Sequence, residues 1–150
     1  MELIARIQDA QKEAMKAKDM ARLSTVRMIL AAVKDREIAQ RTAGAAMGEG
    51  DVLALLGKMV KQRQESAKVY QEGGRPELAD KELAEIRVIE TFLPKPLTEA
   101  EVEAAVAAAV AEAGAQSIKD MGRVMGVLKS RYTGQMDFGA VGALIKARLG

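Results

Sequence analysis

Apolar residues recur along most of the chain at spacings of three and four, which is the spacing of one face of an α-helix. The first segment shows the pattern in Leu3, Ile4, Ile7, Ala10 and Ala14. No segment shows the strict alternation of apolar and polar residues that marks a half-buried strand. Only 3% of the residues are aromatic, whereas strands favour aromatic and β-branched side chains. The sequence therefore predicts an all-α protein.

Four helical segments are predicted before residue 94, in a hairpin-like N-terminal lobe of residues 1–93. We expect Asp19 to cap the second segment and Asp51 to cap the third, because an Asp side chain accepts hydrogen bonds from free N–H groups at a helix start. The turn between the third and fourth segments is predicted at Gly73-Gly74-Arg75-Pro76, where glycine follows one helix and proline opens the next.

The stretch Phe92-Leu93-Pro94-Lys95-Pro96-Leu97-Thr98 separates two lobes. Proline removes a backbone donor and clashes with the preceding turn, so we expect the incoming helix to end at Leu93 and residues 94–97 to form a spacer. Thr98 and Glu101 then have the spacing of a capping box, which starts a new helix.

A compact three-helix C-terminal lobe is predicted for residues 98–150. Its first helix ends at Gly114, its second starts within Ser117–Asp120, and Asp137 caps its third. The expected inward residues of the last helix are Phe138, Val141, Leu144, Ile145 and Leu149.

The residue types present exclude several kinds of chemistry. The chain has neither His nor Cys, so it has no Ser-His or Cys-His nucleophile and no ordinary zinc site. The carboxylate pairs Glu82/Glu85 and Glu99/Glu103 fit solvated helix faces better than an acid–base pair. We predict no catalytic residue, no metal and no cofactor, and no catalysis by the chain alone.

The N-terminus carries charge too early for a signal peptide, and the longest apolar run covers only eight residues, 104–111. We therefore expect no membrane partner and a cytoplasmic protein.

Positive charge is concentrated near the C-terminus, although the net charge of the chain is only +2. Residues 116–150 contain six bases and two acids. The bases are Lys119, Arg123, Lys129, Arg131, Lys146 and Arg148. They could bind phosphates of folded RNA, or they could form an ordinary solvated face. With two Phe and two Tyr in the chain, a stacking platform for single-stranded bases is not expected.

Two glycines, Gly122 and Gly126, interrupt a predicted helix, although glycine there costs roughly 1 kcal/mol relative to alanine. Their spacing of four puts them on one side of the helix. They could allow another helix to pack closely, or they could let a ligand backbone approach beside Arg123 and Lys129. Both interpretations remain open.

The sequence resembles the GatB/YqeY family over nearly its whole length. The segments that carry the resemblance are Ser24-Thr25-Val26-Arg27-Met28-Ile29-Leu30, Gly74-Arg75-Pro76-Glu77-Leu78-Ala79-Asp80-Lys81-Glu82 and Asp120-Met121-Gly122-Arg123-Val124-Met125-Gly126. The chain looks like the small stand-alone YqeY-type member. Its C-terminal lobe is similar to the tail domain of GatB, a component of the glutamine-dependent aspartyl/glutamyl-tRNA amidotransferase.

The resemblance implies a non-catalytic module of translation that contacts tRNA, and possible association with a tRNA-modifying or aminoacylating enzyme. It implies no DNA binding. Two alternatives are a protein–protein adaptor of the translation machinery and an accessory part of a carbon–nitrogen ligase that uses glutamine as amido donor. The family label of glutamine-dependent ligase is interpreted as inherited from the amidotransferase.

Overall fold

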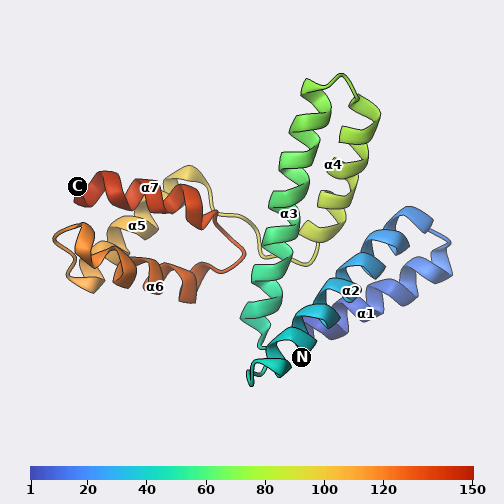
Figure 1. The fold of residues 1–150 in the computed structure, drawn as a ribbon, viewed down its shortest axis with the longest axis horizontal. Helices are drawn as coiled ribbons and strands as arrows, with labels where there is room; N and C mark the ends of the chain where they lie inside the picture. The colour runs from blue at the N-terminus through green and yellow to red at the C-terminus, as the bar shows by residue number, and fades with distance from the viewer. The chain divides into compact units, whose positions relative to one another are not determined.

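A computed structural model describes residues 1–150, and every regular element in it is helical, which confirms the all-α prediction (Figure 1). The chain divides into two compact units, Met1–Pro94 and Lys95–Gly150. Each unit has its own cluster of buried apolar residues.

The N-terminal unit consists of two helical hairpins (Figure 1). Its helices are α1 (Glu2–Ala17), α2 (Met20–Thr42), α3 (Glu49–Glu72) and α4 (Pro76–Glu90). In its core, Ile7 of α1, Ile29 of α2 and Leu56 of α3 are all fully buried. Pro76 is the first residue of α4, where its missing N–H costs no helical hydrogen bond.

Most helix boundaries lie within a few residues of those predicted, because the local signals fix them. Asp19 caps α2 as expected, its Oδ1 accepting a hydrogen bond from Arg22 N at 3.1 Å. The prediction that Asp51 caps α3 is wrong, since α3 begins at Glu49. Asp51 instead lies in the first turn and accepts a hydrogen bond from Gly48 N at 2.8 Å, which also lowers the pKa of its carboxyl. Helix α4 ends at Glu90, before the expected Leu93.

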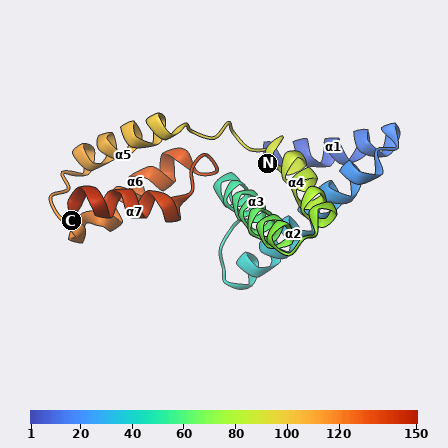
Figure 2. The ribbon, with the colours of Figure 1, turned by 90° about the horizontal axis from the view of Figure 1, so that it is seen from above.

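The C-terminal unit consists of three α-helices, which Figure 2 labels, and one short 3₁₀ helix. They enclose a small core of buried apolar residues. The elements are α5 (Glu99–Ala113), η1 (Ile118–Asp120), α6 (Met121–Tyr132) and α7 (Phe138–Leu149). The predicted capping box is present: Glu101 N donates to Thr98 Oγ1 at 3.2 Å, and Thr98 N donates to Glu101 Oε1 at 3.1 Å. Helix α5 ends at Gly114, whose φ of 62° is one that side chains disfavour.

The segment before α5 is hydrogen-bonded to the turn before α7. Leu97 N donates to the Gln135 carbonyl at 2.9 Å, and Gln135 Nε2 donates to the Lys95 carbonyl at 3.2 Å. These long-range bonds attach residues 95–97 to the C-terminal unit.

One expectation for the core of this unit needs correction. Leu144 is predicted to point inward, yet 41% of it is exposed, because Val141 and Ile145 occupy the buried side of α7. On α5, Ala105 and Ala109 are buried beside Val106, so alanines supply much of the contact that this helix makes with the core.

Candidate nucleic-acid interface

The two glycines of α6 lie on the surface. A Cβ built on Gly122 or Gly126 would meet no atom within 4 Å outside its own helix turns. The interpretation that these glycines allow close helix–helix packing is therefore wrong. The packing side of α6 is formed by Val124 and Leu128, both fully buried. The glycines leave a bare strip of helix backbone facing solvent.

Basic residues flank this strip. One side of α6 carries both glycines and two bases. In chain order these residues are Gly122, Arg123, Gly126 and Lys129, at sequence intervals of one, three and three. Lys119 precedes them in η1. Lys119 and Lys129 are exposed and neither takes part in an ion pair, so both ammonium groups can meet a phosphate.

Arg123 is held in place by Asp120. Asp120 Oδ2 accepts hydrogen bonds from Gln116 N at 3.0 Å and Ser117 N at 3.4 Å, while its Oδ1 accepts one from Arg123 Nη2. The bond from Gln116 N is the main cause of a lowered pKa of the Asp120 carboxyl, and the bond from Arg123 adds to it. Asp120 thus fixes the turn that leads into η1 and orients Arg123 beside the glycine strip, but it neutralises part of that residue's charge.

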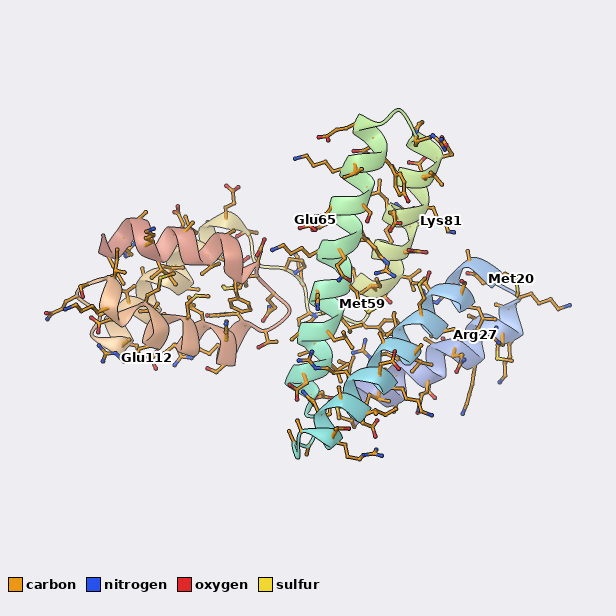
Figure 3. The ribbon with its side chains drawn as sticks, viewed as in Figure 1. Met20, Arg27, Met59, Glu65, Lys81 and Glu112 are labelled. Atoms are coloured by element: carbon orange, nitrogen blue, oxygen red, sulfur yellow. The ribbon has the colours of Figure 1, made fainter.

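Arg131 has a partner as well. Its Nη2 lies 2.6 Å from Oε1 of Glu112 in α5, and this hydrogen bond raises the pKa of the guanidinium. Glu112 is labelled in Figure 3. Both side chains are about half exposed, so the pair links α5 to α6 at the surface. We assign Arg131 a smaller share of any phosphate contact than the unpaired bases.

The last two predicted bases are exposed on α7. Lys146 and Arg148 form no ion pair. The end of α7 lies beside η1, since a Cβ on Gly150 would lie 3.6 Å from Ile118 Cδ1. The structure therefore brings the α7 end, with its two bases, next to the segment that carries Lys119. The four unpaired bases are Lys119, Lys129, Lys146 and Arg148.

The N-terminal unit contains an ion pair that the sequence pattern did not predict. Arg63 Nε donates to Glu85 Oε2 at 3.0 Å, and the two side chains are only 14% and 15% exposed. Arg63 also donates to the carbonyl of Met59, one turn earlier on α3. The expectation that Glu85 lies on a solvated face is therefore wrong. The available signal was the position of Arg63 on the apolar stripe that contains Met59 and Val60.

No group of three or more Asp or Glu side chains is arranged to hold a metal ion. None of the helices combines the length and the apolarity needed to cross a membrane.

The curated relatives of this chain include fungal proteins named "Altered inheritance of mitochondria protein 41, mitochondrial". The protein of Clavispora lusitaniae is 39% identical over 82 residues, which cover 55% of this chain and 46% of the relative. The protein of Lachancea thermotolerans is 31% identical over 106 residues, or 69% of this chain and 56% of the relative. The chain spans about half the length of the curated relatives it matches.

The mitochondrial name of these relatives contradicts the expected cytoplasmic localisation. That expectation was wrong because it rested on the charged N-terminus and the short apolar runs. These features bear on secretion and membrane insertion, and they do not distinguish the cytoplasm from the mitochondrion.

The family described as "Yqey-like protein" matches residues 4–149, which include both units. The match covers the Thr98 capping box as well as the glycine strip of α6. The chain therefore belongs to the YqeY-like protein family.

Proposed function

We propose that the C-terminal unit binds folded RNA of the tRNA type through its phosphate backbone. The observation that carries this proposal is the bare backbone strip at Gly122 and Gly126, exposed beside Lys119 and Lys129, which have no acidic partner.

Electrostatics supports the proposal. Each ammonium or guanidinium group that meets a phosphate releases condensed counterions, and this release supplies most of the non-specific affinity for nucleic acid. The pairing of Arg123 and Arg131 with acids leaves Lys119, Lys129, Lys146 and Arg148 as the strongest candidates for phosphate contacts.

The glycine strip supports a backbone ligand rather than a base-stacking one. Without side chains at two surface positions, a sugar–phosphate strand can approach the helix closely enough for its phosphates to reach the flanking lysines. Tyr132 and Phe138, the aromatic residues of this unit, are partly buried against its core and do not present a stacking surface. Recognition would then depend on RNA shape and backbone.

The choice of tRNA among folded RNAs rests on the resemblance of this unit to the tail domain of GatB in the tRNA amidotransferase. The names of the fungal relatives do not mention RNA. An association with a tRNA-modifying or aminoacylating enzyme is part of the same proposal.

The experiment measures the affinity of the full chain for total tRNA as salt rises from about 50 to 200 mM. With four phosphates engaged, the slope of log K against log salt is about −3 to −4, so affinity falls on the order of a hundredfold. The double variant Lys119→Gln/Lys129→Gln should weaken binding and make this slope shallower by about 1 for each lysine removed.

The matched control is Lys12→Gln/Lys16→Gln, which removes the same charge from exposed positions of α1. If the control weakens binding as much as the α6 variant, the interaction is general charge attraction and the proposed site is incorrect. Absence of binding at the lowest salt concentration overturns RNA binding altogether.

A further inference from the structure

A cleft lies in the C-terminal unit, lined by α5, α7 and the segment that leads into α5. Its volume is about 530 Å³, which is within the range of about 300–1,000 Å³ typical of ligand sites. None of the six bases assigned above to RNA binding is among the residues that line it.

The walls of the cleft are apolar. Leu97 comes from the entering segment, Val102 from α5 and Leu144 from α7. Leu144 is 41% exposed on a helix whose neighbours Val141 and Ile145 are buried. Because a leucine exposed at the side of a cleft leaves apolar surface in water, covering it with an apolar partner is favourable.

The cleft is already formed before any partner arrives. The bond from Leu97 N to the Gln135 carbonyl joins its two edges, and the Thr98 capping box fixes the start of α5 at its side. A preformed site avoids part of the ordering cost of binding.

The rim of the cleft is acidic. Glu99 and Glu103, one turn apart on α5, line it and form no ion pair. A third carboxylate, that of Asp137, accepts a hydrogen bond from Gly139 N at the start of α7. The whole of residues 98–115 contains four acids and no base, so nothing on α5 neutralises this edge.

We infer that this cleft binds a helical segment of a partner protein that has apolar residues along one side and Lys or Arg beside them. The apolar walls between two helices fit the side chains of an amphipathic helix, which anchors at positions three and four residues apart. The carboxylates at the rim attract the flanking cations of such a segment and repel anionic lipid or RNA phosphates. This surface is separate from the glycine strip of α6, and the inference does not depend on RNA binding.

The test uses the full chain and two synthetic amphipathic helical peptides that share the same leucine face. One peptide has Lys at its flanking positions and the other has Glu. Fluorescence anisotropy measures affinity, and ¹⁵N chemical shifts locate the contact. We expect the Lys peptide to bind about tenfold or more tighter than the Glu peptide, with shifts at Leu97, Val102 and Leu144.

Three variants of the protein sharpen the test. Leu144→Gln should weaken the Lys peptide about tenfold or more, because it removes an apolar anchor. Ala143→Gln is the matched control, since Ala143 is exposed on the same helix but does not line the cleft. Glu99→Gln/Glu103→Gln should remove the preference for the Lys peptide.

Equal affinity for both peptides, or shifts confined to residues outside the cleft, overturns the inference. Sedimentation of the protein alone tests a second copy as the occupant. If the chain self-associates and Leu144→Gln abolishes this, the cleft is a homodimer contact and the inferred partner is incorrect. The tRNA measurement on the Leu144→Gln variant should be unchanged, so failure here and failure of the RNA proposal are distinguishable.

Discussion

The two separate cores predict that a cavity in one unit leaves the other folded. Leu128 is fully buried in α6 and packs in the core of the C-terminal unit. Replacement of a buried leucine by alanine costs about 2–5 kcal/mol. A unit of the length of Lys95–Gly150 has a total stability of roughly 3–8 kcal/mol. Leu128→Ala should therefore remove a large part of the stability of this unit.

Urea unfolding followed by tyrosine fluorescence measures the effect. The chain has two tyrosines and no tryptophan, so in a Tyr70→Phe background Tyr132 alone reports on the C-terminal unit. With a slope of about 1 kcal/mol per molar urea, a loss of about 3 kcal/mol lowers the midpoint by about 3 M.

The matched control is Leu56→Ala, which opens a cavity at a fully buried position in the core of the N-terminal unit. It should leave the Tyr132 transition unchanged. If Leu56→Ala shifts that transition as much as Leu128→Ala does, the two units unfold as one, and the reasoning from separate cores is refuted.

Three further predictions concern individual side chains. Gly122→Ala and Gly126→Ala should each stabilise α6 by about 1 kcal/mol in urea unfolding, because the added methyl meets open space, while both weaken tRNA binding if RNA backbone approaches there. Glu85→Gln should destabilise the N-terminal unit by about 1–3 kcal/mol, because it leaves the mostly buried Arg63 without its counter-charge; an unchanged midpoint would contradict this. Folding lowers the pKa of the Asp120 carboxyl below its ordinary value of 3.8. The ionised carboxylate therefore stabilises the fold fully at pH values well above 3.8, and this stabilisation is lost as the pH falls through the lowered pKa. The stability difference between the wild-type chain and Asp120→Asn should therefore shrink between pH 6 and about pH 3, as measured by urea unfolding at each pH.

The helices themselves follow from the sequence because their signals are local. The Thr98 capping box, the Asp19 and Asp137 caps and the Gly114 end each act between residues a few positions apart. Where two residues compete for the same helix start, as Gly48 and Asp51 do, the local signal misplaced the boundary by a few residues.

The residues of the candidate sites depend on which helix surfaces are covered by neighbouring helices. The spacing of residues along one helix does not contain that information. Periodicity placed Leu144 with Val141 and Ile145, yet in this unit the packed stripe of α7 is too narrow to cover it. The same limit applied to the spacing of Gly122 and Gly126, which fits both a helix contact and an open surface.

The sequence by itself determined the all-α class, most of the helix ends and the segment in which the bases gather, because these depend on near neighbours and on composition. Only the tertiary structure decided that the glycines of α6 face solvent, that Arg63 pairs with Glu85, and that Leu144 borders an acidic cleft. The physical reason is that burial and ion pairing are set by contacts between residues far apart in the chain, and these contacts exist only after the helices have packed.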